Sequence, residues 1–273
     1  MTRMRFEGKV AIVSGGGTGI GAATAALLSR EGASVAITGR RPEPLAEVSA
    51  ATGAAAFPGD ASSADHVAAA VAATVDRFDG LDIVVANAGI GLGGAAGEVS
   101  REQWAETLDV NLTGAMLLVR SALPHLVRRG GGSIVLVSSV SGLVAAPRSA
   151  AYEVSKAGLL ALMRSVALDY GHLGVRSNAV CPGWIHTAMG DAAIAEIASE
   201  RRISLADAYT LVNEPVPLKR AGTPDEVAAC CAFLASDEAS YVNGAAIVVD
   251  GGATVVDVTS LPWSSPTRDE TPA

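Results

Sequence analysis

A tyrosine and a lysine stand four residues apart in the segment Tyr152-Glu153-Val154-Ser155-Lys156. On a helix, residues at i and i+4 project from one face, so the two side chains would reach the same site. A free tyrosine has a pKa of about 10, and acid–base work near neutrality requires lowering it by up to ~3 units, about 4 kcal/mol. A neighbouring ammonium group supplies such stabilisation. The pair is suited to proton transfer, although each residue alone is an ordinary component of a core or surface.

A glycine-rich turn is suited to a different task, the binding of a phosphate. The sequence Ser14-Gly15-Gly16-Gly17-Thr18-Gly19-Ile20-Gly21 lies between an apolar run and an alanine-rich stretch. Glycines allow backbone N–H groups to approach a pyrophosphate, and the N-terminus of a following helix adds a partial positive charge. Glycine turns also arise for steric reasons alone, but a strand before and a helix after favour a dinucleotide site.

The elements that must position these residues alternate along the chain. Runs of β-branched and apolar residues predict strands at Lys9 to Ser14, Ser34 to Thr38, Leu81 to Ala86, Ser133 to Ser138, Val175 to Val180 and Ala245 to Asp250. We expect helices at Gly19 to Arg30, Asp65 to Phe78, Arg101 to Arg129, Ala150 to Gly171 and Pro224 to Ala235, with Pro124 marking a break in the longest. The strands are apolar almost throughout, which is typical of parallel strands buried on both faces. The pattern predicts an α/β fold with a doubly wound parallel sheet of the Rossmann type.

The domain organisation follows from the same pattern. No boundary divides the chain, so we expect a single domain over residues 1–257 and a C-terminal tail, rich in Pro, Ser and Thr, over 258–273. The segment from Thr187 to Pro217 escapes the alternation, and its apolar residues have the spacing of short amphipathic helices. Inserted segments of this length are often lids. We expect this one to close over a largely apolar substrate and to become ordered on binding.

Charge and cysteine content argue against several kinds of partner. The formal net charge is −8 and the pI is about 5.0, which leaves no basic footprint for nucleic acid or an anionic membrane. We find no uncharged apolar run of about 18 residues that predicts a membrane span, and no signal peptide. The three cysteines and four histidines lack the spacing of metal ligands. A small-molecule substrate, no metal and a cytoplasmic location are expected.

The ordered set of motifs resembles the short-chain dehydrogenase/reductase family over about residues 5 to 252. The glycine spacing follows that family's TGxxxGxG variant rather than GxGxxG. The other motifs follow in the family's order: Asp60 after the third strand, Asn87-Ala88-Gly89 after the fourth (ANAG, where the family usually has NNAG), Asn111 in DVNLTG, Ser138-Ser139 at the end of the fifth, YxxxK, and Cys181-Pro182-Gly183 with Thr187. Any one of these motifs is common, and their order carries the resemblance.

The resemblance implies hydride transfer between NAD(P)(H) and a carbon that bears a hydroxyl or carbonyl group. It assigns Tyr152 as general acid/base, and Lys156 as the group that lowers the tyrosine pKa and holds the nicotinamide ribose. Ser139 would hydrogen-bond the substrate oxygen, and Asn111 would anchor a water in the proton relay. The predicted cofactor-binding residues are Gly15, Gly17, Thr18, Gly19, Ile20, Gly21, Arg40, Arg41, Asp60, Ala61, Asn87, Ala88, Gly89, Val110, Tyr152, Lys156, Pro182, Gly183, Ile185 and Thr187.

The choice between NADP(H) and NAD(H) depends on the residues after the second strand. An acidic residue about 20 positions beyond the glycine motif usually binds the ribose 2′-hydroxyl of NAD, but Gly39 stands there. Arg40 and Arg41 could pair with a 2′-phosphate, so NADP(H) is favoured over NAD(H). Two solvated loop arginines are the alternative interpretation. Thr18 argues against NADP(H), since many relatives that use it carry a basic residue there.

The substrate pocket is predicted more coarsely. We expect Ser141, Leu143 and Trp184 to line it, while an aromatic plug of the core is the alternative role for Trp184. The sequence does not indicate which substrate is bound. The resemblance also points to a homotetramer, with faces of the helices at 101–129 and 150–171 packed against a symmetry mate. Covering the sheet of the same chain is their other possible role.

Two alternatives to an alcohol dehydrogenase or ketoreductase stay open at this stage. Sugar-nucleotide epimerases and dehydratases also use a YxxxK helix, but no substantial substrate domain follows Gly252. A cofactor-binding regulator without catalysis is the second alternative. The presence of Asn111, Ser139, Tyr152 and Lys156 argues against it.

Overall fold

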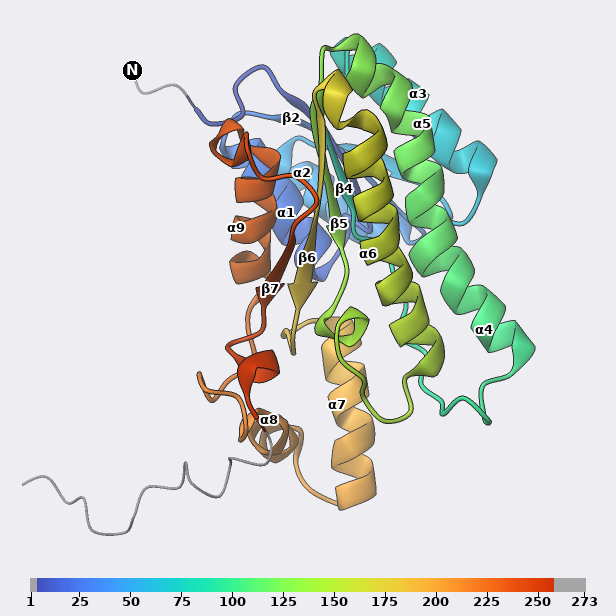
Figure 1. The fold of residues 1–273 in the computed structure, drawn as a ribbon, viewed down its shortest axis with the longest axis vertical. Helices are drawn as coiled ribbons and strands as arrows, with labels where there is room; N and C mark the ends of the chain where they lie inside the picture. Colours follow the sequence, from blue (N-terminus) through green and yellow to red (C-terminus); the bar gives the residue numbers. More distant parts are fainter. Residues whose placement is uncertain (1–3, 258–273) are drawn as a thin grey trace, which may run out of the picture.

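The computed structural model describes residues 4–257 and shows a parallel seven-stranded sheet with helices on both faces (Figure 1). The strands are β1 (Val10–Ser14), β2 (Ser34–Gly39), β3 (Ala55–Pro58), β4 (Ile83–Ala86), β5 (Gly132–Val137), β6 (Val175–Pro182) and β7 (Ala246–Val249). Their order is β3-β2-β1-β4-β5-β6-β7, and every neighbouring pair is parallel. All the carboxyl ends therefore meet at one edge of the sheet. The predicted single-domain, doubly wound fold is confirmed; the tail predicted at 258–273 lies outside the described residues.

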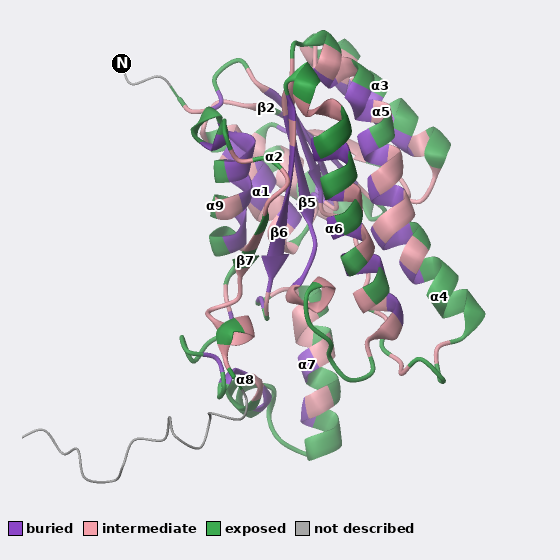
Figure 2. Cartoon of the chain, viewed as in Figure 1, coloured by how far each residue is buried: buried purple, intermediate pink, exposed green. Residues whose placement is uncertain are grey.

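The helices form two layers. They are α1 (Gly19–Arg30), α2 (Pro42–Thr52), α3 (Ala64–Phe78), α4 (Arg101–Leu108), α5 (Gly114–Arg128), α6 (Ala150–Tyr170), α7 (Ala188–Arg201), α8 (Leu205–Asn213) and α9 (Pro224–Ala235). One face of the sheet carries α1, α2 and α9, and the other carries α3, α5 and α6 (Figure 1). Each layer closes its own apolar core, so the central strands are buried on both faces (Figure 2). Among the cysteines, Cys181 and Cys231 are buried in the core and Cys230 is partly buried against it.

Helix α2 was missing from the predicted elements, and β3 was expected only from the family motif, as the third strand before Asp60, without bounds of its own. Helix α2 has clear start and stop signals, with Pro42 at its first position and Gly53 in the left-handed region just beyond its end. Leu45 is its one buried residue, so no apolar stripe reveals it. Strand β3 is four residues long and half-buried, because it lies at the edge of the sheet. Short edge elements carry too little hydrophobic patterning to be found this way.

The long helix predicted over 101–129 is interrupted, but the break expected at Pro124 is wrong. The interruption is a π turn, Asp109–Thr113, which joins α4 to α5, and Pro124 lies inside α5. Pro124 and Arg120 both lie on the exposed face. Since proline cannot donate to the carbonyl four residues earlier, that carbonyl loses its helical partner, and solvent on this face can replace it.

The helical segment 101–128 also has the length and composition of a membrane-spanning helix. One 18-residue window in it has a mean hydropathy of 1.2, and half of that window is buried in the fold. Leu118, Val119, Ala122 and Leu126 pack into the core beside the sheet. A helix that fills a protein core meets the same criteria of length and composition.

Beyond the carboxyl edge of the sheet lies an excursion made of α7 and α8, which we call the α7–α8 excursion (residues 187–217; Figure 1). The short amphipathic helices predicted for this segment are present. Ile194, Ala198 and Ala208 form a small apolar core between the two helices, separate from the two cores of the sheet. The excursion is a folded unit attached to the main domain.

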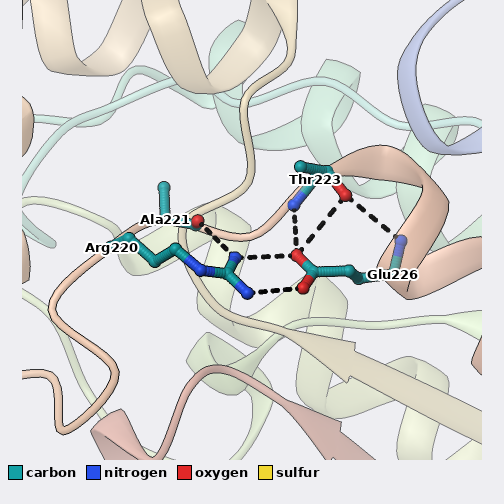
Figure 3. Close-up of polar contacts among 4 residues, drawn as sticks. All are labelled: Arg220, Ala221, Thr223 and Glu226. Carbon is teal, nitrogen blue, oxygen red and sulfur yellow. Dashed lines mark hydrogen bonds and ion pairs between the residues drawn. The ribbon is translucent and has the colours of Figure 1, made fainter.

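The chain returns from this excursion through a tightly bonded corner (Figure 3). Arg220 forms a bidentate ion pair with Glu226, with N–O distances of 2.6 and 2.9 Å. Glu226 also accepts a hydrogen bond from the backbone of Thr223, whose hydroxyl caps α9. The bond from Arg220, followed by that from Thr223, lowers the pKa of Glu226 to about 2. This corner fixes where the excursion ends and α9 begins.

Candidate active site

The glycine turn between β1 and α1 forms a cradle at the carboxyl edge of the sheet. Gly15 has a φ of +65°, and a Cβ there would lie 2.8 Å from Nδ2 of Asn87. A Cβ on Gly21 would collide with the carbonyl oxygen of Gly15. Thr18 makes no side-chain cap at the start of α1, so the first N–H groups of the helix are left for an anion. The turn fits a pyrophosphate, which is the group of NAD(P) that it would hold.

Ser14 and Asn87 fasten this turn to the end of β4. The hydroxyl of Ser14 accepts hydrogen bonds from the backbone N–H groups of Asn87 and Ala88, at 3.0 and 3.1 Å. In return, Nδ2 of Asn87 donates to the carbonyls of Ser14 and Gly15, at 3.0 and 3.2 Å. The two loops that would flank the cofactor are therefore one bonded unit. Ser14 was not among the predicted site residues, although it stands where the family motif has threonine.

The end of β2 holds the residues expected to choose between the two cofactors. Gly39 ends the strand, and a Cβ there would meet only Leu45, at ordinary contact distances of 3.7 to 3.9 Å. A side chain therefore fits at this position. Arg40 and Arg41 are exposed, and among the described residues neither has a hydrogen bond or ion pair. Both guanidinium groups are available to a ligand.

Asp60 opens the turn after β3. Its Oδ1 accepts hydrogen bonds from the backbone and the hydroxyl of Ser62, at 2.9 and 2.8 Å. The backbone bond is the largest cause that lowers the pKa of this carboxyl, and the nearby charge of Arg40 adds to it. Asp60 is held in its ionised form. The carbonyl of Ala61 packs against the start of α5 at Gly114, where a Cβ would lie 2.7 Å away.

Tyr152, Ser139 and Lys156 meet where α6 begins. Tyr152 is hydrogen-bonded to Ser139, and Nζ of Lys156 lies 5.5 Å from the centroid of the Tyr152 ring. Nζ donates to the carbonyl of Val137 at 3.0 Å, and burial lowers the pKa of Lys156 to about 8. Burial raises the pKa of Tyr152, while the Ser139 bond opposes the rise. Burial does not supply the lowering that acid–base work requires, and the effect of the Lys156 ammonium on Tyr152 stays a prediction.

Asn111 lies fully buried in the π turn between α4 and α5. Its Oδ1 accepts from the N–H of Ile90 at 2.7 Å, and its Nδ2 donates to the carbonyl of Ile90 and to Ser155 Oγ, both at 3.0 Å. Ser155 in turn donates to the carbonyl of Tyr152. The side chain thus ties the loop after β4 to α6, and the interruption of the helix turns it toward the site. Its water-anchoring role stays a prediction.

The end of β6 lies at the same edge of the sheet and leads into the α7–α8 excursion. Pro182 ends the strand, and a Cβ on the next residue, Gly183, would lie 2.9 Å from Cβ of Asp250. Thr187 caps α7 through a hydrogen bond from Gly190 N, at 3.1 Å. Its methyl group faces Gly19, whose Cβ would lie 3.1 Å from it. The first residue of the α7–α8 excursion therefore contacts the glycine turn.

Several large apolar side chains are exposed near the carboxyl edge of the sheet. Trp184 is 37% exposed, so it does not act as a plug of the core. Leu143 and Met189 are exposed as well; Met189 belongs to the segment from Thr187 to Pro217 that was expected to cover the substrate. Ser141 differs from these because its backbone N–H donates to Ser139 Oγ at 3.1 Å. That bond occupies a lone pair of Ser139, so its hydroxyl proton can be donated to Tyr152 or to a substrate oxygen.

The predicted catalytic residues thus gather at the carboxyl edge of the sheet, together with the glycine turn and the ends of β4 and β6. Comparison with known proteins agrees with this geometry. A family model described as "Enoyl-(Acyl carrier protein) reductase" matches residues 15–254. The chain belongs to the short-chain dehydrogenase/reductase family.

Relatives in this family match nearly the whole chain. A cis-4-hydroxycyclohexanecarboxylate dehydrogenase from Sinomonas cyclohexanicum is 39% identical, over 92% of this chain and 98% of its own. A meso-2,3-butanediol dehydrogenase from Serratia marcescens is 38% identical, over 93% and 98%. The crystal structure of levodione reductase superposes with a TM-score of 0.88 at 32% identity, and covers 93% of this chain and 100% of that one. The protein is an NAD(P)-dependent oxidoreductase that acts on alcohol or ketone groups.

Proposed function

We propose that the protein oxidises an uncharged secondary alcohol, or reduces the matching ketone, with Tyr152 as the group that transfers the proton. The observation that carries this proposal is the meeting of Tyr152, Ser139 and Lys156 beside a glycine turn shaped for pyrophosphate. Bound NAD(P) supplies or accepts the hydride. Ser139 holds the substrate oxygen with its hydroxyl proton, and Tyr152 gives a proton to that oxygen or takes one from it. Lys156 keeps the phenol acidic and holds the ribose.

Our proposed cofactor is NADP(H). Its support is the absence of an acidic side chain at Gly39, together with two exposed arginines that have no ion-pair partner among the described residues. A 2′-phosphate would pair with Arg40, and charge-assisted hydrogen bonds to such a group are stronger than neutral ones. The carboxylate of Asp60, which lies near the charge of Arg40, would contact the adenine end of the cofactor.

The proposed substrate is apolar, and the α7–α8 excursion is proposed as its lid. Leu143, Trp184 and Met189 are large apolar side chains exposed near the carboxyl edge of the sheet, where a bound apolar molecule would cover them. The charged side chains of this segment, Arg201, Arg202, Asp207 and Glu214, are exposed. The contact between Thr187 and the glycine turn would couple the position of the lid to cofactor binding.

We also propose that the protein is a cytoplasmic homotetramer. A closed tetramer with two-fold symmetry needs two different self-complementary faces. One candidate is the apolar hollow between α5 and α6, lined by Met116, Leu123, Leu162 and Tyr170 among others. The second lies on the far side of the sheet, where Phe233 on α9, Val248 on edge strand β7 and the loop residue Tyr241 are exposed. Light scattering of the intact chain at micromolar concentration tests this: a particle of about 27 kDa excludes a tetramer.

The experiment for the catalytic proposal is a panel of substrates assayed with both cofactors. Cyclic and branched ketones, ketones bearing a carboxylate, and the corresponding alcohols are followed by the absorbance of the reduced nicotinamide. We expect turnover of the uncharged apolar members, with a higher kcat/KM for NADP(H) than for NAD(H). A preference for the carboxylates contradicts the apolar pocket. Binding of reduced cofactor without turnover of any member favours the non-catalytic alternative.

A further inference from the structure

Three consecutive residues at the carboxyl end of β5, Val137 to Ser139, each bond a different part of helix α6. The carbonyl of Val137 accepts from Nζ of Lys156 at 3.0 Å, and Ser139 bonds the hydroxyl of Tyr152. Between them, Oγ of Ser138 donates to the main-chain carbonyl of Lys156 at 2.8 Å. The first and third contacts belong to the reaction described above. The second has no part in it so far.

The bond from Ser138 is not needed to satisfy the helix. Lys156 lies inside α6, where its carbonyl already accepts a hydrogen bond from the backbone one turn later. Ser138 is 3% exposed, so its hydroxyl requires a partner, but an alanine there would leave no buried polar group unpaired. The bond therefore adds one specific restraint, which fixes the turn of α6 that carries Lys156 against the end of β5.

The surroundings of Ser138 leave this turn little freedom to move. A Cβ on Gly142 would lie 2.9 Å from the carbonyl of Lys156 and 3.0 Å from Oγ of Ser138. From the neighbouring strand β6, the buried side chain of Cys181 lies next to Ser138. Strand β6, the turn at Gly142 and helix α6 thus enclose the hydroxyl of Ser138. A glycine at 142 is required because any side chain would displace either the carbonyl or the hydroxyl.

We propose that Ser138 is a positioning residue, whose hydroxyl sets the place of Lys156 so that the ammonium reaches both the cofactor ribose and the Tyr152 ring. This inference rests on the roles proposed for Tyr152 and Lys156. Without the hydroxyl, the turn that carries Lys156 is free to shift. The ammonium then stabilises the Tyr152 phenolate less, and the phenol loses its proton at a higher pH.

The test compares Ser138→Ala with Ser133→Ala, a matched control at the other end of the same strand. Ser133 is equally buried, and its hydroxyl also donates to a main-chain carbonyl, that of Leu234, at 2.9 Å. Both variants lose one buried hydrogen bond, so we expect similar decreases in Tm. Alcohol oxidation requires deprotonated Tyr152, so kcat rises with pH to a plateau. We expect Ser138→Ala to move the midpoint of that rise upward by about one pH unit and to lower kcat about tenfold below it. Ser133→Ala should change neither.

Two further variants make the test decisive. Ser138→Thr keeps the hydroxyl and should restore the midpoint of the wild-type protein. The methyl group of Gly142→Ala would push against the carbonyl of Lys156, so this variant should shift the midpoint in the same direction as Ser138→Ala. It tests the inference if Ser138→Ala does not fold. Equal midpoints for Ser138→Ala and Ser133→Ala, or a shifted midpoint in Ser138→Thr, would overturn the inference. If either of these results is obtained while Tyr152→Phe is inactive in the same assay, only the role proposed for Ser138 fails. If Tyr152→Phe is active, the proposed function itself fails.

Discussion

The carboxyl edge of the sheet and the α7–α8 excursion adjoin each other at Thr187, yet they are stabilised in different ways. At the edge, side chains bond across elements that are far apart in the sequence, such as Ser14 to the loop after β4 and Asn111 to α6. In the excursion, contacts are local: a core of three buried residues, and a bond of 2.6 Å from Tyr209 Oη to Asp191 Oδ1. One region is held by the whole domain, and the other mainly by itself.

This difference assigns separate tasks to the two regions. Proton and hydride transfer require fixed distances, which the cross-linked edge provides. Opening for substrate requires a part that can move as a unit, and a helix pair with its own core can do so without unfolding. We therefore expect substitutions at the edge to change kcat and cofactor binding, and substitutions in the excursion to change the KM of the substrate. The following predictions use matched residues from the two regions.

The largest expected effect comes from the two lysines. Lys156→Ala removes the ammonium that acts on Tyr152 and holds the ribose, so it should lower kcat/KM on the order of a thousandfold and weaken cofactor binding as well. Lys219→Ala is the control, because among the described residues the Lys219 side chain bonds only the carbonyl of Glu214, at the end of the excursion. Steady-state kinetics and cofactor fluorescence titration measure both effects. Similar losses of kcat/KM and cofactor binding in the two variants would show that Lys156 has no specific role in the reaction.

A substitution at Gly39 should alter cofactor choice while leaving the excursion unaffected. Gly39→Asp places a carboxylate where a Cβ has only ordinary contacts, so the fold should be preserved. Its charge repels a 2′-phosphate and accepts a hydrogen bond from the 2′-hydroxyl of NAD. We expect the ratio of kcat/KM values to move toward NAD(H) about a hundredfold, ~2.7 kcal/mol. A wild-type ratio that already favours NAD(H) would identify Arg40 as a solvated loop residue.

The smallest effect is expected in the excursion. Ile194 is fully buried in its small core, and Ile194→Ala should loosen the packing of α7 on α8. We expect the substrate KM to rise about fivefold, ~1 kcal/mol, while kcat at saturation is unchanged.

Hydrogen exchange of residues 188–214, with and without cofactor plus a substrate analogue, provides the structural counterpart of that prediction. Binding should increase protection in the wild-type protein and increase it less in Ile194→Ala. Equal protection in the bound and free wild-type protein would mean that the segment is a fixed part of the structure, and the lid proposal would have to be dropped.

How far the sequence predicts the structure also differs between the two regions. The edge could be predicted because its residues occur in ordered motifs: the glycine turn follows an apolar strand, and Tyr152 and Lys156 share one helix face. The excursion was recognised only as short amphipathic helices, which carry no information about their partner. Its three-residue core and the Tyr209–Asp191 bond depend on how α7 meets α8.

The residues that sequence reasoning missed have one property in common. Ser14 and Ser138 bond backbone groups 73 and 18 residues away, and Ser155 accepts a hydrogen bond from Asn111, 44 residues away. Serine is a common residue with no distinctive spacing, so its type alone gave no signal. The position of the break in the long helix was missed for a similar reason, since a π turn has no strong sequence signature, whereas proline does.

The most direct test of the central claim compares two tyrosines that differ in region but undergo the same change. Tyr152→Phe removes the transferable proton at the edge, and Tyr209→Phe removes a hydroxyl that bonds Asp191 in the excursion. Single-turnover hydride transfer is measured in both variants, with cofactor binding followed by fluorescence. We predict that Tyr152→Phe binds cofactor nearly as the wild-type protein does but transfers hydride at least a hundredfold more slowly, ~2.7 kcal/mol or more in the barrier, while Tyr209→Phe stays within a few fold. A rate for Tyr152→Phe within about tenfold of the wild-type rate, ~1.4 kcal/mol, would contradict the assignment of Tyr152 as the acid/base.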